Sequence, residues 1–446
     1  MKQPNVVVFF TDQQRWDTMG AYGNPCGLTP AFDRMAAGGT CFEHAMTPQP
    51  VCGPARAVLQ TGKYATTLGT YRNGIPLPRS EKTMAHYFGE AGYHTGYIGK
   101  WHLASGRLAV AEEERGGYQY WLGANALEES SQPYNTVVYG NDNEEVKLPG
   151  YRVDALTDAA IRYIDDRKDN PFFLFLSFLE PHFQNCWDNF PAPHTEQPVT
   201  SPYTPPDLAA LQGTSPQHLP GYYGMVRRLD MALGRIQDAL ESLGLAEDTI
   251  ILFTADHGCH FKTRNAEYKR SCHESSIHIP MALAGGPFRS GGRRRELMSL
   301  VDIAPTLLDA CGIPVPADME GNSVMPVLNR QSEEWPDDTF IQISEAEVGR
   351  AVRTHKWKFG VGAPDKDPVG DAFADVYQEA FLYDLENDPW ELDNLAGQQS
   401  HRLVREKLSE RLRDRIRTVE DREAAVELLA DKPSGQRKLF SNEENK

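Results

Sequence analysis

The sequence predicts an α/β fold, in which a large, doubly wound, mostly parallel sheet flanked by helices precedes a smaller C-terminal antiparallel α+β subdomain. Three observations support this fold class. Short apolar runs rich in β-branched residues alternate with amphipathic helical patterns along most of the 446 residues, as in parallel sheets with crossover helices. Titratable side chains directly follow several of these runs, as at the ligand-binding edge of such sheets. Near residue 335 the pattern changes to runs of alternating polarity, which is typical of antiparallel strands.

The elements of the first part are predicted in chain order. The apolar run NVVVFF, residues 5–10, predicts a buried parallel strand. Residues 29–39 predict a helix, because Thr29 is a suitable N-cap, Pro30 fits the first helical position and Gly38 ends the pattern. Three helix and strand pairs follow, with helices at 82–92, 154–168 and 221–244 and strands at 93–99, 172–179 and 249–255.

The C-terminal part, residues 335–446, is predicted to be a separate subdomain after an α/β domain at 1–334. Residues 339–345 and 349–362 alternate in polarity and predict antiparallel strands. The charged, periodic stretch 400–430 predicts a long helix. The subdomain should therefore hold a small sheet and one helix.

Two segments show little periodicity. Residues 186–220 contain many Pro, Thr and His residues, and we expect a long loop close to the mouth of a site. The tail 431–446 is polar, and we expect it to fray.

Composition excludes two classes of partner. The chain has 45 basic and 62 acidic side chains and a net charge of −17, which argues against nucleic acid because phosphate binding needs a basic face. The longest apolar run, 171–179, is too short to cross a membrane. The N-terminal apolar run stops at Thr11 and is too short for a signal peptide, so we expect a cytoplasmic protein. A periplasmic or secreted protein would look the same if its leader had been removed.

The seven cysteines do not form a recognisable metal or disulfide framework. Their number is odd and no Cys-x-x-Cys pair occurs, so neither a zinc ribbon nor a set of disulfides is indicated. Six of them are expected to be reduced thiols. The seventh, Cys52, lies in a context that needs a separate explanation.

Four predicted core strands are followed by side chains that can do chemistry. Asp12 and Gln13 follow the first strand, Lys100 and His102 follow the second, His182 follows the third, and Asp256 and His257 follow the fourth. Carboxyl ends of parallel strands meet at one edge of a sheet, so we expect one shared site there. The alternative for Asp12 and Asp256, taken singly, is that each caps a helix.

The donors among these residues suit a hard divalent cation. Asp12, Gln13, Asp256 and His257 offer mostly oxygen atoms, which favours calcium, magnesium or manganese. The single imidazole leans slightly towards manganese and is compatible with calcium.

Cys52 stands at the predicted start of a helix. Pro54 fits the first turn, and Arg56 adds a positive charge one turn away, so this helix start favours an anion. A helix terminus contributes only about 0.3–1 kcal/mol, whereas hydrolysis of an inert ester needs the barrier lowered by roughly 8–23 kcal/mol. A nucleophile and an acid are therefore required. A soft thiolate is a poor partner for a hard cation, and ordinary cysteine chemistry leaves Cys52 unexplained.

The motif around Cys52 resembles the signature of the type I sulfatases of the alkaline phosphatase superfamily. Cys52-Gly53-Pro54-Ala55-Arg56 has the spacing Cys-x-Pro-x-Arg, and Leu59-Gln60-Thr61-Gly62 follows as Leu-x-Thr-Gly. The resemblance extends over nearly the whole chain and includes residues 5–24, 29–56, 96–103, 253–258, 267–283 and 382–396. It implies the sulfatase, or alkaline phosphatase-like, fold.

The resemblance also implies two cofactors. In this family the cysteine is oxidised to formylglycine by a formylglycine-generating enzyme, and the hydrated aldehyde offers hard oxygens to the metal. The metal ligands would be Asp12, Gln13, modified Cys52, Asp256 and His257, with Ca²⁺ the first choice and Mg²⁺ or Mn²⁺ also compatible. Gln13 stands where many members have a second Asp.

The catalytic residues implied by the resemblance are Cys52, Arg56, Lys100, His102, His182 and Lys269. Arg56 and Lys100 would hold the diol and the sulfate, while His182 and Lys269 would contact the ester oxygen. One hydroxyl of the diol would attack sulfur, His182 or Lys269 would protonate the departing alcohol, and His102 would deprotonate the second hydroxyl so that sulfate leaves. Two departures concern the leaving-group side: His273 stands where many relatives have Tyr, and Lys262 competes with Lys269 for its role.

The expected activity is hydrolysis of a sulfate monoester. A small-molecule or oligosaccharide sulfate is the expected substrate; a sulfated sugar is preferred because the segment 183–220 could cover an extended polar substrate, and aryl sulfates remain open. The alternatives are a phosphonate monoester hydrolase or phosphodiesterase, an inactive sulfatase-fold binding protein, and an ordinary cysteine-dependent hydrolase. The oligomeric state is not indicated.

Several other polar residues have roles that the sequence leaves open. His260, Arg264 and His278 could line a substrate pocket or simply pack. Trp187 and His194, in the long loop, could contact the substrate. The basic stretch 289–295 (RSGGRRR) is interpreted as a solvated turn rather than an anion site.

Overall fold

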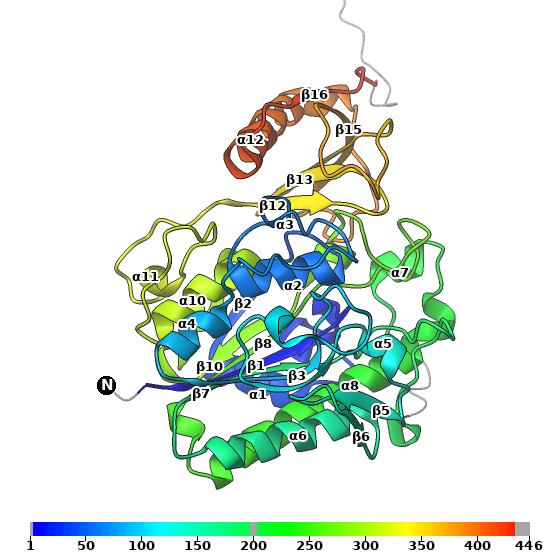
Figure 1. Cartoon of the computed structure of the whole chain (residues 1–446). Coiled ribbons are helices and arrows are strands. Elements are labelled where there is room, and N and C mark those ends of the chain that lie inside the picture. The colour runs from blue at the N-terminus through cyan, green and yellow to red at the C-terminus, as the bar shows by residue number, and fades with distance from the viewer. Residues whose placement is uncertain (1–2, 197–202, 433–446) are drawn as a thin grey trace, which may run out of the picture.

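The predicted fold class is confirmed by a computed structural model that describes residues 3–196 and 203–432 (Figure 1). An eleven-stranded mixed sheet lies between two layers of helices, and a separate five-stranded sheet follows towards the C-terminus. In the described ranges, no helix is both long and apolar enough to span a bilayer.

Four parallel strands form the centre of the large sheet. They are β8 (Thr249–Ala255), β1 (Asn5–Thr11), β7 (Phe172–Ser177) and β3 (His94–Lys100), side by side in that order. Each pair of neighbours is parallel. Strands buried on both faces need apolar side chains at consecutive positions, which explains why β1, β7 and β8 were predictable as apolar runs, whereas β3 has the mixed sequence HTGYIGK.

The edges of the large sheet are mixed and contain most of the strands that the sequence analysis did not predict. On one side β10 (Met281–Ala284) is antiparallel to β8, and β2 (Thr40–Met46) follows it. The remaining edge strands are β9 (His278–Ile279), β11 (Gly292–Ser299), β4 (Tyr120–Ala124), β5 (Thr136–Tyr139) and β6 (Glu145–Leu148). The basic stretch 289–295 is therefore not only a turn, because it runs into β11.

Alternate residues of each central strand face different helix layers. Val7 and Phe9 of β1 pack with helices α1 (Pro30–Gly38), α6 (Arg152–Arg167) and α8 (Ser215–Ser242). Val6 and Val8 face the other layer, which contains α2 (Cys52–Thr61), α4 (Met84–Glu90) and α10 (Ile303–Ala310). Figure 1 shows these two layers on opposite faces of the sheet.

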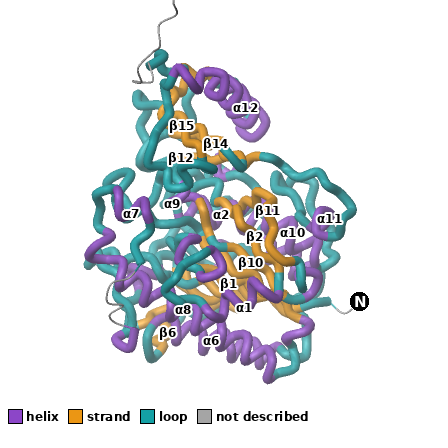
Figure 2. Tube along the Cα trace, turned by 180° about the vertical axis from the view of Figure 1, so that it is seen from behind, coloured by secondary structure: helices purple, strands orange, loops and turns teal. Residues whose placement is uncertain are grey.

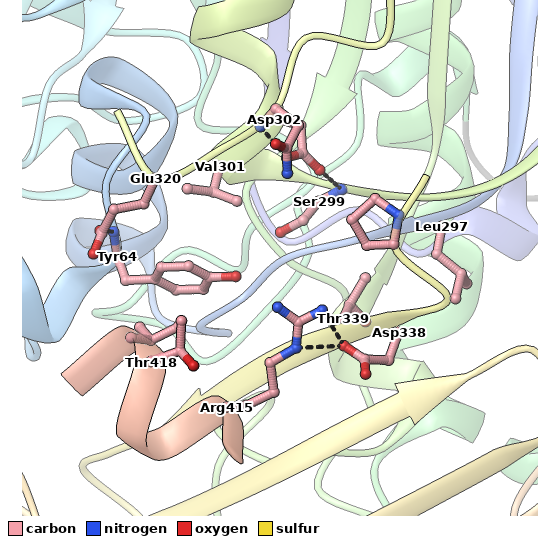
Figure 3. Close-up of a pocket in the computed structure, with 13 residues that line it drawn as sticks. Tyr64, Leu297, Ser299, Val301, Asp302, Glu320, Asp338, Thr339, Arg415 and Thr418 are labelled. Carbon is pink, nitrogen blue, oxygen red and sulfur yellow. Dashed lines mark hydrogen bonds and ion pairs between the residues drawn. The ribbon is translucent and has the colours of Figure 1, made fainter. Parts of the chain in front are cut away.

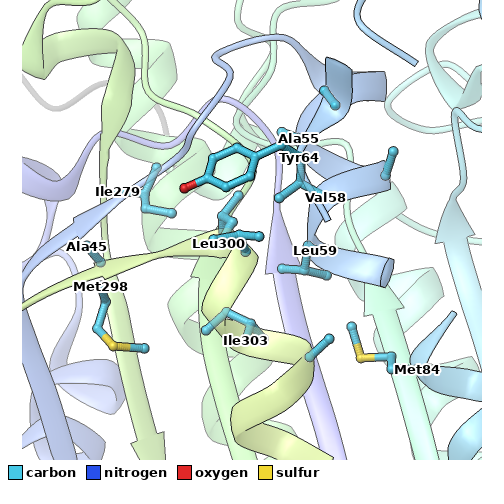
Figure 4. Close-up of a cluster of buried hydrophobic side chains, with 14 of the residues drawn as sticks. Ala45, Ala55, Val58, Leu59, Tyr64, Met84, Ile279, Met298, Leu300 and Ile303 are labelled. Carbon is cyan, nitrogen blue, oxygen red and sulfur yellow. The ribbon is translucent and has the colours of Figure 1, made fainter. Parts of the chain in front are cut away.

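Helix α2 is held rigidly in the apolar layer. Ala55, Val58 and Leu59 are fully buried and pack in one cluster with Leu300 and Ile303 (Figure 4). Every residue from Cys52 to Thr61 is buried. A helix packed over its whole length cannot shift without losing these contacts, so its N-terminal residue has a fixed position.

The cap of α1 differs from the prediction. Thr29 is the N-cap residue, but its side chain does not cap the helix and instead accepts a hydrogen bond from the Gly20 N–H at 2.8 Å. The carboxylate of Asp230, on α8, accepts from the N–H groups of Ala31 and Phe32 at 2.9 and 2.8 Å. The Asp230 carboxylate, and not the Thr29 side chain, therefore accepts the free N–H groups at the start of α1.

Three predicted boundaries are corrected by the structure. The segment 186–220 is not a continuous loop, because it contains α7 (Pro206–Ala210) and the first turns of α8. The helix predicted at 400–430 is α12 (Arg402–Glu420), which ends where Asp421 adopts a left-handed conformation with φ 50°. Residues 197–202 and the part of the tail from 433 to 446 lie outside the described residues.

The second sheet is antiparallel apart from its last strand. Strands β12 (Asp338–Ile343), β13 (Gly349–Thr354), β14 (Trp357–Gly362) and β15 (Val376–Asp384) pair in sequence order, and β16 (Ala425–Glu427) adds in parallel to β15. The sheet starts at Asp338, while the domain boundary at 334/335 remains a prediction. The other short helices of the described residues are α3 (Ala65–Leu68), α5 (Leu127–Ser130), α9 (Glu274–Ile277) and α11 (Met325–Leu328).

Buried ion pairs join the second sheet to the first. Glu274, the first residue of α9, accepts from Lys358 at 2.8 Å and from Arg353 at 3.3 Å. Lys358 also reaches Glu391 at 2.5 Å. Figure 2, seen from behind, shows α9 beneath β12 and β14. Removing one partner of such a buried pair is costly because the other charge stays buried, so the two sheets are tied together firmly.

A separate cavity lies at this junction, away from the predicted site residues. It has a volume of about 230 Å³ and is lined by Tyr64, Ser299, Asp302 and Arg415 among others (Figure 3). Arg415 is paired there with Asp338 at 2.6 Å. None of the residues predicted to bind metal or substrate lines this cavity, so we do not regard it as the active site.

Replacing Glu347 with Gln is expected to stabilise the protein above neutral pH. Burial raises the pKa of Glu347 from 4.5 to about 7. The folded protein therefore keeps a proton that the unfolded chain loses, and stability falls as the pH rises from about 4.5 to 7. We expect the free energy of unfolding of Glu347→Gln, measured with urea, to exceed that of the wild type by about 1–3 kcal/mol at pH 8 and to equal it at pH 4. The exposed Glu334 provides the control variant Glu334→Gln; an equal gain for both variants, or none for Glu347→Gln, would contradict the prediction.

Candidate active site

The carboxyl ends of β1, β3, β7 and β8 bring the predicted residues together. Asp12, Asp256 and His257 stand beside Cys52, and one ligand atom from each of the four lies within 4.8 Å of the others. All four side chains are buried. Cys52 Sγ is 3.2 Å from His257 Nε2 and 3.5 Å from Asp12 Oδ1. The shared site predicted from the strand ends is therefore present.

The same cluster fits a divalent cation by its donor chemistry. Gln13 Oε1 is buried without a hydrogen-bond partner in the described part of the chain, and Gln13 itself is held at φ 65° with its N–H on Asp256 Oδ1 at 2.9 Å. His257 Nδ1 lies 2.9 Å from the Gly258 carbonyl oxygen, an orientation that leaves Nε2 free to bind metal.

The two carboxylates of the cluster repel each other. Burial and the negative charge of Asp12 raise the pKa of Asp256 to about 6. A divalent cation between the two carboxylates would remove this repulsion. The residues present thus fit a hard metal ion with Asp12, Gln13, Asp256 and His257 as ligands.

Arg56 connects the metal cluster to the neighbouring strands. Its guanidinium contacts Asp12 at 3.0 Å and Asp256 at 3.3 Å. It also donates to Ser177 Oγ and to the Lys100 carbonyl, both at 2.8 Å. Arg56 lies on the buried first turns of α2, one turn after Cys52, and is only 2% exposed. The buried helix and these contacts therefore hold the Arg56 guanidinium in a fixed position.

Cys52 is surrounded by positive charge. It is the first residue of α2, and Lys269 Nζ lies 2.8 Å from its sulfur. Burial raises the pKa of the Cys52 thiol, but Lys100, Lys269 and His257 outweigh burial and hold the pKa well below its usual range. A thiolate in this position would be nucleophilic, and any other group at residue 52 would meet the same positive field.

His182 and Lys269 form one unit beside Cys52. Lys269 Nζ and His182 Nε2 are 3.2 Å apart, and His182 Nδ1 is 2.7 Å from the Phe183 carbonyl oxygen. Because a carbonyl can only accept, Nδ1 carries the imidazole proton and Nε2 accepts from the lysine. Burial and the charge of Lys269 lower the pKa of His182. His182 is therefore neutral, and the mobile proton of the pair rests on Lys269.

His102 is also part of the site. Its backbone has φ 65°, and its N–H donates to the Asn125 carbonyl at 2.9 Å. The ring nitrogen Nδ1 is buried without a partner in the described residues. Hydrogen bonding from His102 is one of the influences that lower the pKa of the Cys52 thiol. A strained backbone that directs a ring towards the reacting group is common at functional sites.

Three residues near the site were not singled out from the sequence. Glu128, on α5, pairs with Lys100 at 3.1 Å. Ser177 Oγ links Arg56 to the Lys100 carbonyl. Asn73 Oδ1 accepts from the Gly53 N–H at 2.9 Å. Glu128 follows the carboxyl end of β4, a strand that the sequence analysis did not predict; the other two carry no comparable sequence signal.

The two lysines near Tyr268 have different surroundings. Lys262 pairs with Asp188 at 3.0 Å, whereas Lys269 contacts Cys52 and His182. His260, fully buried, holds the Lys269 carbonyl through Nε2 at 3.0 Å. Burial lowers the pKa of His260 to about 4, so its role is to support the lysine segment in the neutral state.

The other open residues lie outside the cluster. Arg264 donates to the Trp390 carbonyl at 2.9 Å, and His278 stacks on Trp16 with ring centroids 4.5 Å apart. His273 contacts the Tyr383 hydroxyl at 3.1 Å. Trp187 is 69% exposed, and His194 stacks on Tyr134. None of these contacts joins them to the metal cluster.

Comparison with known proteins identifies the family. The family model for sulfatases matches residues 4–313, which is well over half of the chain. The chain belongs to the sulfatase family. A second family model, N-sulphoglucosamine sulphohydrolase C-terminal, matches residues 266–418. The resemblance seen in the sequence is therefore confirmed, and the chain is a hydrolase of sulfuric esters.

Individual sulfatases and their neighbours agree over most of the chain. The chain is 30% identical to an ulvan-active sulfatase of Formosa agariphila, over 94% of this chain and 82% of that protein. The fold is also similar to that of a protein solved in complex with its substrate D-glucosamine-2-N,6-O-disulfate, with a TM-score of 0.77 at 22% identity. The match covers 94% of this chain and 99% of that protein. Phosphonate monoester hydrolase of Agrobacterium radiobacter shares the fold, with a TM-score of 0.69 at 22% identity and coverage of 92% and 94%.

Proposed function

We propose that this sulfatase removes sulfate from a carbohydrate sulfate monoester, using a formylglycine made from Cys52 and one divalent cation, with Ca²⁺ the first choice. The observation that carries the proposal is the position of residue 52. It starts a buried helix, 2.8 Å from Lys269 and 3.2 Å from His257, so it faces both an oxygen-rich metal cluster and a proton donor. Hard oxygens at residue 52 would suit a hard cation, whereas sulfur would not.

The residues of the metal cluster have separate roles in this proposal. Asp12, Gln13, Asp256, His257 and modified residue 52 would hold the cation. When bound, the cation supplies positive charge that polarises the nucleophile and offsets charge developing on the sulfuryl oxygens. The hydrated aldehyde of residue 52 supplies two hydroxyls on one carbon, one to attack sulfur and one whose deprotonation releases sulfate.

The cations of the site would position the negatively charged ester. Arg56 and Lys100 are fully or almost fully buried and are fixed by carboxylates and carbonyls. Buried, preorganised charges stabilise the transition state without first having to reorganise. We therefore assign both residues to binding of the diol and the sulfuryl group.

Proton transfer would be divided between the two sides of residue 52. Lys269 holds the mobile proton of its pair with His182 and lies next to the nucleophile, so we assign protonation of the departing alcohol to Lys269, with His182 fixing its direction. His102, whose Nδ1 lacks a partner in the described residues, is the base for the second hydroxyl. Steps of this kind contribute roughly 10²–10⁴-fold each.

A carbohydrate is proposed as the substrate for two reasons. The Formosa agariphila relative is an ulvan-active sulfatase, and a neighbour of the same fold was solved with a disulfated glucosamine. In the segment 183–220, Trp187 is exposed, and an exposed indole can stack on a sugar ring.

Coexpression with a formylglycine-generating enzyme tests the proposal. The peptide containing Cys52 should then show loss of sulfur and gain of an aldehyde by mass spectrometry. Activity should be measured with sulfated saccharides, aryl sulfates, an aryl phosphonate and an aryl phosphodiester. We expect the highest kcat/KM on a sulfated saccharide. Full activity with unmodified Cys52 would contradict the mechanism, and a higher kcat/KM on the phosphonate or phosphodiester would identify a phosphonate monoester hydrolase or phosphodiesterase instead.

A further inference from the structure

Glu128 places a buried negative charge beside the sulfate-binding lysine. It lies on α5, directly after β4, and its side chain is 7% exposed. One carboxylate oxygen accepts from Lys100 Nζ at 3.1 Å. The other, Oε2, is buried without a hydrogen-bond partner in the described residues. The Glu128 carbonyl accepts from Gln184 Nε2 at 2.9 Å, so the backbone at this position is anchored too.

The charge of Glu128 is not cancelled by Lys100. That ammonium also contacts Asp12, at 2.8 Å, so Lys100 is shared between two carboxylates, although Asp12 has a second partner in Arg56 at 3.0 Å. Burial raises the pKa of Glu128, but the ammonium of Lys100 outweighs burial and lowers the pKa to about 2. Glu128 is therefore ionised at working pH, close enough to Cys52 for the two charges to interact.

A fixed negative charge at a binding site affects ligands in proportion to their own charge. A sulfate monoester carries one negative charge, whereas a phosphate monoester carries two near pH 8. Glu128 repels the doubly charged ester about twice as strongly as a singly charged ester of the same shape. The basic side chains and the cation attract both, so Glu128 reduces the advantage that the dianion would otherwise have.

We propose that Glu128 is a specificity-determining residue that favours singly charged esters over doubly charged ones. The inference rests on the proposed function of the site, because it assumes that the ester binds between residue 52 and Lys100. It concerns the charge of the substrate and not the identity of its alcohol. The same charge would admit a phosphodiester, which is also singly charged.

The test is the variant Glu128→Gln, which removes the charge and keeps the shape. With the metal-loaded, modified enzyme at pH 8, kcat/KM is measured for 4-nitrophenyl sulfate, 4-nitrophenyl phosphate and methyl 4-nitrophenyl phosphate. We expect the preference for the sulfate ester over the phosphate monoester to fall about tenfold or more. The preference for the sulfate ester over the singly charged diester should stay within about twofold.

Binding provides a second readout that does not depend on turnover. Titration calorimetry is done with inorganic sulfate, a dianion, and with methyl sulfate, a monoanion. In Glu128→Gln the affinity for inorganic sulfate, relative to the affinity for methyl sulfate, should rise about tenfold. If the wild-type enzyme hydrolyses no sulfate ester, the proposed function is wrong. The ratio of the two anion affinities still tests the role of Glu128 in that case.

Two control variants separate charge from position. Glu129→Gln makes the same change in net charge at the next residue, which is partly exposed and pairs with Arg107 at 2.9 Å; it should leave every ratio unchanged. Glu128→Asp keeps the charge and should keep the selectivity. An equal loss on all three esters in Glu128→Gln, with unchanged ratios, would overturn the proposal and leave Glu128 as a support for Lys100.

Discussion

Replacing Cys52 with serine is expected to turn the sulfatase into a reagent that reacts once per molecule. A serine hydroxyl at the start of α2, beside Lys269 and the metal cluster, can still attack the sulfuryl centre slowly. It then forms an ordinary sulfate ester on the protein. That ester has no second hydroxyl on the same carbon, so His102 has no proton to remove and sulfate cannot leave. Release of alcohol should stop at about one equivalent per site.

This result can be measured by rapid mixing and mass spectrometry. The burst of 4-nitrophenol should equal the enzyme concentration, and a digest should contain a peptide sulfated on the introduced serine. Cys41→Ser makes the same substitution at a buried cysteine on β2, 1% exposed, and should turn over normally. Sustained turnover by unmodified Cys52→Ser near the wild-type rate would show that the aldehyde does not clear the site.

The second large effect is expected from Asp12→Asn, which should remove the divalent cation from the site. The variant keeps an oxygen donor but loses one of the two carboxylate charges, and charge count largely sets the affinity of such sites. Arg56, at 3.0 Å, and Lys100, at 2.8 Å, also lose a counter-charge. After chelation, the free energy of unfolding of the variant should therefore be about 3–5 kcal/mol lower than that of the wild type. The activity of the variant should be almost abolished.

Metal content by mass spectrometry and urea unfolding after chelation test these two expectations. Asp17→Asn is the matched control, because Asp17 is also buried and paired, with Arg15 at 2.6 Å, but lies outside the cluster. It should lose stability and keep its metal. A fully active Asp12→Asn with normal metal content would contradict the assignment of Asp12 as a ligand.

The central part of the fold could be predicted because its physical signal is strong. Strands β1, β7 and β8 are buried on both faces, and burial on both faces requires an unbroken apolar run. Edge strands β5 and β6 have only four residues each, which is too short for a polarity pattern to identify a strand. The end of α12 was missed because charged, helix-forming residues continue past Asp421, where only the backbone conformation ends the helix.

The site was predictable to the extent that residues follow strands. Asp12, Lys100, His182 and Asp256 could be placed at one edge because parallel strands align their carboxyl ends. Glu128 follows β4, whose mixed sequence YWLGA gave no strand signal, so its position was not considered. The tautomer of His182, which lets Nε2 accept from Lys269, could not be predicted, because it depends on one carbonyl, that of Phe183, 2.7 Å from Nδ1.

The ion pairs between the sheets have a consequence for biosynthesis. The segment that holds Lys269 is fixed by Lys358 and Glu391 through Glu274, so the pocket around Cys52 is complete only when the chain has been made as far as Glu391. At about 5–20 residues per second, roughly 17–70 s separate translation of Cys52 from that of Glu391. In the finished protein Cys52 is 1% exposed. An enzyme that converts Cys52 would therefore have to reach it before the chain has folded, and this interval is the shortest time that it would have.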